Sequence, residues 1–280
     1  MSDDLARYSR QTLLPGFGER GQRRLLGSHA LVVGCGALGC VASDLLVRGG
    51  VGRVTLIDRD VVETSNLHRQ ILFDEADAAE GLPKAEAARR RLARVNSGVR
   101  VAGIVADLEW RSAERLALDG PHGRPDVIVD GLDNYETRFL LNDLAVKHGI
   151  PYVYAGVVST HGMVMPVVPD GARGETAGGE RWGSGRPCLR CLFEEAPPAG
   201  SQPTCETVGV LGPAVTVVGG LASGEAFKIL LGAWEAVSRR LVEVDLWRGE
   251  RRDVPLDRVR DPACPCCARR RFDALEGRLG

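Results

Sequence analysis

The sequence contains no run of 18 apolar residues, and its N-terminus is not a basic segment that leads into an apolar one. The first absence argues against a transmembrane span and the second against a secretory signal. Net charge is also nearly absent, because 36 Lys and Arg stand against 37 Asp and Glu. No overall field would hold a polyanion, so we expect a cytoplasmic protein that binds neither nucleic acid nor a membrane.

Cysteine and lysine are both scarce. Eight cysteines in 280 residues are too few for a disulfide scaffold, and two pairs at CxxC spacing favour a metal over a disulfide in a cytosolic protein. Lysine stands at only three positions, Lys84, Lys147 and Lys228, among the 36 basic residues. A lysine in such an arginine-rich chain marks a place where the planar guanidinium fork is unsuitable, although Lys147 and Lys228 are read most simply as exposed helix residues.

The alternation of short apolar runs with helical patterns is the main fold signal. We expect buried parallel strands at 30–33, 53–57, 126–130 and 151–155, and helices at 37–49, 84–95 and 135–148. This order predicts an α/β fold with a doubly wound, Rossmann-like, mostly parallel sheet.

The composition changes near residue 170. The segment 170–187 holds six glycines and is expected to be a flexible loop, and 194–207 is Pro-rich and polar. Beyond them we expect a buried helix at 212–231, a strand at 242–247 and a basic tail with three cysteines. We therefore divide the chain at this point into residues 1–170 and residues 171–280, which we expect to form one continuous domain.

A glycine loop is the first motif that carries chemistry. It runs from Gly34 through Gly36 to Gly39, directly after a predicted strand and at the start of a helix. Glycines there allow the backbone to approach phosphates, which the N–H groups and the positive end of the helix attract. Asp58 follows Gly39 by nineteen residues and is placed to accept hydrogen bonds from a ribose. The alternative is a packing turn without a ligand.

The segment Ser65-Asn66-Leu67-His68-Arg69-Gln70 is rich in hydrogen-bond donors. A dehydrogenase does not need such a segment, whereas a triphosphate needs donors directed at its β- and γ-phosphates. Lys84 follows Pro83 at a predicted helix start, where a cation is mildly unfavourable without a partner anion. It is either a phosphate ligand or an ordinary residue of the first helical turn.

Acidic residues follow the third predicted strand. In open α/β sheets, ligands bind at the carboxyl ends of strands, and a carboxylate beside phosphates is a natural Mg²⁺ ligand. We select Asp133 for this role and expect Asp130 merely to terminate the strand. Asn134 either belongs to this site or caps the helix that starts at Tyr135.

The cysteine pairs predict a C-terminal extension that a zinc ion holds to the middle of the fold. The pairs Cys188-x-x-Cys191 and Cys264-x-x-Cys267 have the spacing of a tetrahedral, structural Cys₄ site. Cys266 leaves the register of the second pair open, and free thiols are the alternative without metal. Cys35 and Cys40 flank the first helix and are expected to be small buried hydrophobes.

Together these motifs resemble the ThiF/MoeB/HesA family, whose members adenylate small ubiquitin-like sulfur-carrier proteins. The resemblance runs from about Arg7 to Cys267 and includes the segments Arg7–Gln11 and Gly209–Pro213. One departure is Ala37, where the family usually has glycine. Alanine costs little there unless the backbone requires a positive φ.

The resemblance implies a role for each of these positions. Asp58 would contact the ribose of ATP, Asp133 would hold Mg²⁺, and Arg10 would enter the partner subunit's site of a homodimer. The phosphates would be held by Asn66, Arg69, Gln70 and Lys84. The zinc ligands would be Cys188, Cys191, Cys264 and Cys267. Cys205 matches a cysteine that bonds to the carrier in the ThiF branch, whereas the MoeB branch does not need its cysteine for adenylation, so the role of Cys205 stays open.

The implied reaction is attack by the carrier's C-terminal carboxylate on ATP, with release of pyrophosphate, as the first step towards a thiocarboxylate for thiamine or molybdopterin-type products. Residues 1–170 would bind ATP, and residues 171–280 would bind zinc and a carrier ending in Gly-Gly. The chain has no length left for a sulfurtransferase domain, so we expect a separate sulfur donor protein. The alternatives are a non-catalytic dimeric scaffold and an NAD-dependent oxidoreductase, which would leave Lys84 and the cysteine pairs unused.

Overall fold

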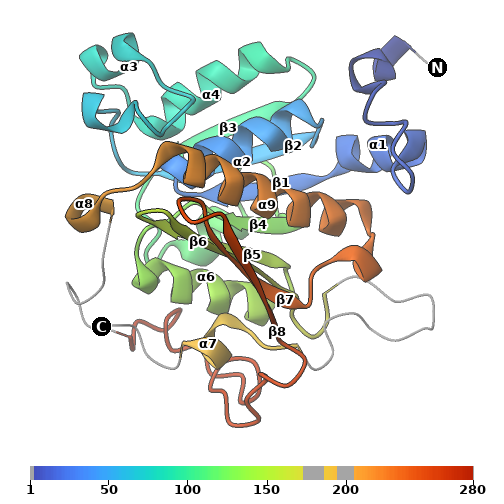
Figure 1. Ribbon diagram of the computed structural model, residues 1–280, viewed down its shortest axis with the longest axis vertical. Helices are drawn as coiled ribbons and strands as arrows, with labels where there is room; N and C mark the ends of the chain where they lie inside the picture. Colours follow the sequence, from blue (N-terminus) through green and yellow to red (C-terminus); the bar gives the residue numbers. More distant parts are fainter. Residues whose placement is uncertain (1–2, 173–185, 194–204, 280) are drawn as a thin grey trace.

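The computed structural model describes residues 3–172, 186–193 and 205–279. Eight strands form one sheet in the order β3-β2-β1-β4-β5-β6-β7-β8, with helices on both faces (Figure 1). Strands β1 to β5 are parallel, and β6, β7 and β8 continue the sheet in antiparallel fashion. The predicted doubly wound, mostly parallel α/β sheet is thus confirmed.

The strands are β1 His29–Val33, β2 Arg53–Asp58, β3 Arg100–Val105, β4 Val127–Asp130, β5 Tyr152–Val158, β6 His161–Val167, β7 Arg240–Asp245 and β8 Glu250–Pro255. The predicted strand at 242–247 begins two residues earlier, at Arg240. Strands β3, β6 and β8 were not predicted, because β3 is a half-exposed edge, β6 contains Gly162 and Pro166, and β8 is largely charged. None of the three has the continuous apolar run of a buried parallel strand.

The α-helices are α1 Gly18–Gly27, α2 Ala37–Arg48, α3 Glu75–Glu80, α4 Lys84–Val95, α5 Ala113–Leu118, α6 Tyr135–His148, α7 Leu189–Leu192, α8 Cys205–Val208 and α9 Gly212–Leu231. Short 3₁₀ helices are η1 Asp3–Tyr8, η2 Thr64–Asn66 and η3 Trp234–Ala236. The predicted bounds of α4, α6 and α9 are confirmed, and α2 ends one residue before its predicted end. Helix α6 ends at Gly149, whose left-handed backbone suits glycine.

Two hydrophobic cores lie on opposite faces of the sheet, because successive strand residues point to opposite sides. Val32 packs with α2, α4 and α9, whereas Leu31 and Val33 pack with α5, α6 and the C-terminal tail. Each face of the sheet is therefore covered by its own hydrophobic core.

Helix α9 is the one helix of the described part of the chain that is long and apolar enough to cross a membrane, judged by length and composition. Half of its most apolar window is buried inside the protein. It packs against α2, β5 and β6 and crosses the sheet beside α2 in Figure 1. This is the environment of a core helix in a globular fold.

The order of the strands places the topological switch point of the sheet at β1. Strand β1 lies between β2 and β4. After β1 the chain forms β2 and β3 on one side of it and then crosses to β4 on the other side. In such sheets, ligands bind outside the carboxyl ends of the strands at this switch point. The segments 173–185 and 194–204, which include most of the two predicted loops, lie outside the described residues.

Candidate functional site

The glycine loop at the end of β1 uses its glycines for different purposes. Gly34 has a φ of +89°, and a Cβ on it would lie 2.5 Å from the carbonyl oxygen of Gly131. A Cβ on Gly39 would lie 1.8 Å from the carbonyl oxygen of Gly34. These two glycines therefore allow the loops after β1 and β4 and the helix α2 to pack closely.

Gly36 has no comparable packing reason to be glycine. Its φ of −74° and ψ of −156° suit other residues, and a Cβ would meet only the carbonyl oxygen of Gly131, at an ordinary 3.5 Å. It is the N-cap of α2 and offers no side-chain cap. The space that a Cβ would fill lies at an uncapped helix N-terminus. Such a space fits a phosphate group. Ala37 is the first helical residue of α2 and has no positive φ, so the departure from glycine there is not strained.

This difference between the glycines can be tested. We expect Gly36→Ala to keep its free energy of unfolding within about 1 kcal/mol of the wild type, and to raise the Kd for ATP at least about tenfold, or about 1.4 kcal/mol. Gly39→Ala serves as the packing control and should lose about 2 kcal/mol or more of stability. Calorimetric titration with ATP and urea unfolding measure the two quantities. Wild-type affinity for ATP in Gly36→Ala would show that no phosphate approaches this backbone.

Asp58, the candidate ribose ligand, also supports the glycine loop. One carboxylate oxygen accepts a hydrogen bond from the Cys35 N–H at 2.5 Å, and the other accepts one from the Asp60 N–H at 2.8 Å. Burial raises the pKa of Asp58, while these N–H groups and the charge of Lys84 oppose the rise. The carboxylate thus joins β2 to the loop after β1, and its contact with a ribose stays a prediction.

Lys84 occupies the first position of α4, as predicted, and its side chain is only 10% exposed. Its Nζ lies 2.9 Å from the Oδ2 of Asp60, a carboxylate that is half exposed. A buried cation at a helix N-terminus opposes the helix dipole. The fold therefore places a positive charge near Asp58, at a helix N-terminus that does not favour it, with the half-exposed Asp60 as its counter-ion.

The donor-rich segment lies on η2 and the turn that follows. Asn66 is buried and closes a capping box with Glu63. Half-buried Arg69 donates from Nη1 to the carbonyl oxygen of Ser65 at 2.9 Å. Gln70 is 3% exposed, and its Oε1 has no hydrogen-bond partner among the described residues. An incompletely bonded buried amide fits a side chain that completes its bonds with a ligand.

The loop after β4 contains Asp133. Its carboxylate is exposed, and the nearest recorded contact is the Asn134 amide at 3.5 Å. Asn134 accepts a hydrogen bond from the Thr137 N–H at 2.9 Å and is the N-cap of α6, so the capping alternative is confirmed. An exposed carboxylate at the carboxyl end of a parallel strand has the chemistry of a Mg²⁺ ligand.

Asp130 is the last residue of β4, as expected, but it does more than terminate the strand. It is fully buried and accepts hydrogen bonds from Tyr152 Oη at 2.6 Å, from Arg138 Nε at 3.1 Å and from the Leu132 N–H at 2.8 Å. Burial raises the pKa of Asp130, and the positive charge of Arg138 opposes this. No sequence pattern signals this network, because its side chains come from β4, α6 and β5.

The four predicted metal ligands form one cluster. The sulfur atoms of Cys188, Cys191, Cys264 and Cys267 all lie within 4.8 Å of one another. Two of the Sγ–Sγ distances are 3.7 and 3.4 Å, and sulfurs bound to one zinc ion in a tetrahedron lie about 3.8 Å apart. Cys266 is not a member of this set and accepts a hydrogen bond from Asn142 Nδ2 at 3.3 Å, so Cys267 is the fourth candidate ligand. Four thiols in this arrangement fit a tetrahedral Zn²⁺ ion.

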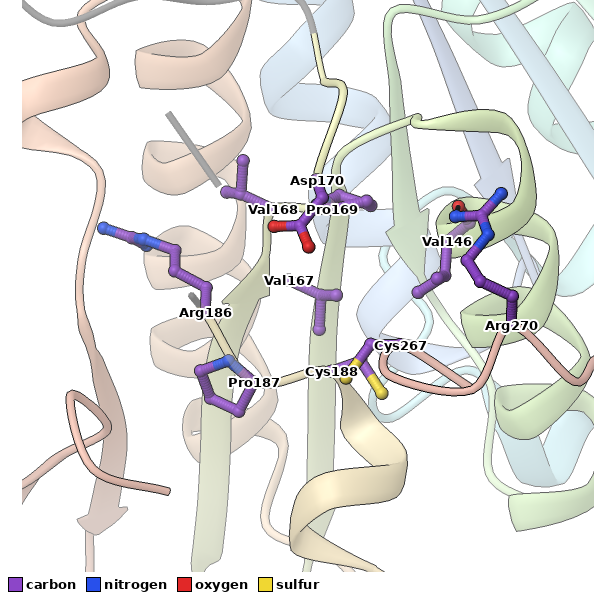
Figure 2. A pocket seen from close by; sticks show the side chains of 10 residues that line it. All are labelled: Val146, Val167, Val168, Pro169, Asp170, Arg186, Pro187, Cys188, Cys267 and Arg270. Carbon is purple, nitrogen blue, oxygen red and sulfur yellow. Dashed lines mark hydrogen bonds between the residues drawn. The ribbon is translucent and has the colours of Figure 1, made fainter. Parts of the chain in front are cut away.

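A small cavity of about 70 Å³ lies against this cluster and not at the glycine loop. Figure 2 shows Cys188 and Cys267 side by side at one end of the cavity, with Asp170 opposite them. Arg186 and Arg270 flank it. Its size suits small groups and not a nucleotide.

Four further predicted residues remain to be placed, namely Cys205, Arg10, Cys35 and Cys40. Cys205 begins α8, and its side chain lies outside the described residues. Arg10 is exposed and follows η1, in a segment that Figure 1 places at the opposite end of the molecule from α3 and α8. Cys35 and Cys40 are buried as predicted, and burial raises the pKa of Cys40 to about 12.

Comparison with known proteins identifies relatives over nearly the whole chain. A model of the ThiF family matches residues 8–266. The chain is 41% identical to the "Sulfur carrier protein ThiS adenylyltransferase" of Bacillus subtilis, over 96% of this chain and 73% of that protein. It is 38% identical to the "Sulfur carrier protein adenylyltransferase" of Thermus thermophilus, over 95% and 91% respectively.

Solved structures give the same architecture. The crystal structure of E. coli MccB with ATP matches with a TM-score of 0.72 at 22% identity, covering 94% of this chain and 74% of that one. At this identity the likeness concerns the fold. The family match and the two relatives establish that the chain belongs to the ThiF family.

Proposed function

We propose that this protein is an adenylyltransferase that transfers AMP from ATP to the C-terminal carboxylate of a small ubiquitin-like sulfur-carrier protein. The observation that carries the proposal is the open N-terminus of α2 at Gly36, with the buried ammonium group of Lys84 nearby. Together they supply backbone donors and a fixed cation for a polyphosphate. Two relatives named as sulfur carrier protein adenylyltransferases support the choice of acceptor.

The carrier's carboxylate is ionised at pH 7, so no general base is needed. It attacks the α-phosphorus of ATP, the bond to the bridging oxygen breaks, and pyrophosphate leaves. Catalysis then depends on alignment and on neutralising phosphate charge. Lys84, Arg69, Asn66 and Gln70 would hold the phosphates, and Asp58 would bind the ribose. Asp133 would hold Mg²⁺, which neutralises part of the phosphate charge when bound.

The remaining proposed roles concern the homodimer, the zinc site, the carrier protein and the sulfur donor. Arg10 would complete the site of the second subunit in a homodimer. The cluster of Cys188, Cys191, Cys264 and Cys267 would hold structural Zn²⁺. Residues 1–170 would bind ATP, and residues 171–280 would bind the carrier. A separate protein would supply sulfur, for thiamine or molybdopterin-type products in the cytoplasm.

The test is ATP–pyrophosphate exchange with a panel of small proteins that end in Gly-Gly. We expect exchange with at least one carrier, abolished in Asp133→Ala. Cys205→Ala should retain it, because the first step uses the carboxylate alone. ATP binding without exchange with any carrier would favour the scaffold alternative. Binding of NAD in place of ATP would favour the oxidoreductase.

A further inference from the structure

The buried guanidinium group of Arg138 joins three parts of the backbone around the loop that carries Asp133. Arg138 is 5% exposed and lies in the first turns of α6. Its Nε donates to Asp130 Oδ2 at 3.1 Å. Its Nη2 donates to the carbonyl oxygens of Leu132 at 2.6 Å and Ala155 at 3.0 Å. One side chain therefore connects the end of β4, the loop after it and β5.

The surroundings hold the guanidinium group in place. It lies 5.5 Å from the ring centroid of Tyr135 and 5.2 Å from that of Tyr154, within the range of cation–π contacts. Tyr152 donates to the same oxygen of Asp130 at 2.6 Å, and this carboxylate is fully buried. A buried ion pair with its hydrogen bonds satisfied defines one geometry, because any other leaves a charge without a partner.

This hydrogen-bond network fixes the backbone of Leu132. Its N–H donates to Asp130 and its carbonyl oxygen accepts from Arg138, so both ends of the residue before Asp133 are fixed. On the other side, Asn134 is fixed as the N-cap of α6. Asp133 itself is exposed and makes no short contact of its own among the described residues. The position of its carboxylate therefore depends on these neighbours.

We propose that Arg138 is a positioning residue that acts through Leu132 to hold Asp133 in the geometry that binds a divalent cation together with ATP. The inference rests on the proposed function, in which Asp133 is the metal ligand. A ligand placed on a loop binds metal well only when neighbouring bonds hold it within a fraction of an ångström. The anchors at Leu132 and Asn134 provide that restraint.

The test uses Arg138→Lys in the full-length protein. A lysine keeps a positive charge opposite Asp130 but lacks the planar fork that serves Asp130, Leu132 and Ala155 together. The matched control is Tyr152→Phe, which removes a different donor from the same carboxylate oxygen and leaves the Leu132 carbonyl bonded. Mn²⁺ binding in the presence of ATP, followed by electron paramagnetic resonance, and amide hydrogen exchange over residues 131–135 are measured without the carrier.

We expect Arg138→Lys to weaken Mn²⁺ binding at least tenfold and to accelerate exchange over 131–135, with thermal unfolding close to that of Tyr152→Phe. Tyr152→Phe should bind Mn²⁺ as the wild type does. If Arg138→Lys does not fold, Asp130→Asn/Arg138→Met removes both charges and also lacks the donor to Leu132, so the same loss is expected. Equal Mn²⁺ binding in wild type and Arg138 variants would overturn this inference alone. A wild-type protein that binds no Mn²⁺ with ATP would overturn the proposed function as well.

Discussion

Replacing Lys84 with methionine will lower carrier-dependent ATP–pyrophosphate exchange by at least about 100-fold, or about 2.7 kcal/mol of transition-state stabilisation. Methionine keeps most of the buried stem and removes the ammonium group. The free energy of unfolding should stay within about 1 kcal/mol of the wild type. Asp60 loses its partner but is half exposed and remains hydrated, and α4 loses an unfavourable cation at its N-terminus. Steady-state exchange and urea unfolding measure the two effects.

Lys147→Met is the matched control for this change. Lys147 lies near the C-terminal end of α6, where a cation is favourable, and its side chain is 38% exposed beside Glu114. We expect its exchange rate to match the wild type, with a small loss of stability. If Lys84→Met exchanged at the wild-type rate, Lys84 would be an ordinary residue of the first helical turn.

Removal of the zinc ion that we propose for the cysteine cluster will have the largest effect on stability. We expect Cys264→Ser to lower the zinc content from one ion per chain and the Tm by roughly 10 °C, corresponding to about 3 kcal/mol. The described residues after β8 form turns and no regular helix or strand up to residue 279. The cluster therefore replaces secondary structure in holding this tail against α6. Elemental analysis, thermal unfolding and limited proteolysis of the tail are the measurements.

Cys266→Ser is the control that changes the packing around the cysteine cluster without removing a proposed metal ligand. Cys266 is buried in the same turn, lies outside the set of four clustered thiols and contacts Asn142 and Asp143. We expect this variant to retain one zinc ion and to lose about 1 kcal/mol. Loss of zinc from Cys266→Ser, or an unchanged Tm in zinc-free Cys264→Ser, would contradict the assignment of Cys267 as the fourth ligand or the structural role of the ion.

The features that the sequence predicted well are those that depend on local backbone geometry. The parallel strands β1, β2, β4 and β5 appear as short apolar runs. Helices α4 and α6 have their predicted bounds because side-chain periodicity and capping at Asn134 are local properties. The glycine loop follows from the same logic, since a turn from a strand into a helix requires glycine at particular positions. The CxxC spacing likewise predicted which thiols meet, except for the choice between Cys266 and Cys267.

Contacts between residues that lie apart in the sequence could be identified only in the folded structure. Nothing near Asp130 in the sequence indicates that Arg138 and Tyr152 converge on its carboxylate, or that Asp58 supports the loop after β1. The choice of Cys267 over Cys266 depends on how the tail turns against Asn142 of α6. These contacts depend on packing between separate strands and helices. Burial removes water as an alternative partner, so each buried polar group must form its hydrogen bonds with a neighbouring protein group. Local sequence patterns predicted strands β1, β2, β4, β5 and β7, the glycine loop and the CxxC pairs, and the packing of the folded chain determined which side chains complete them.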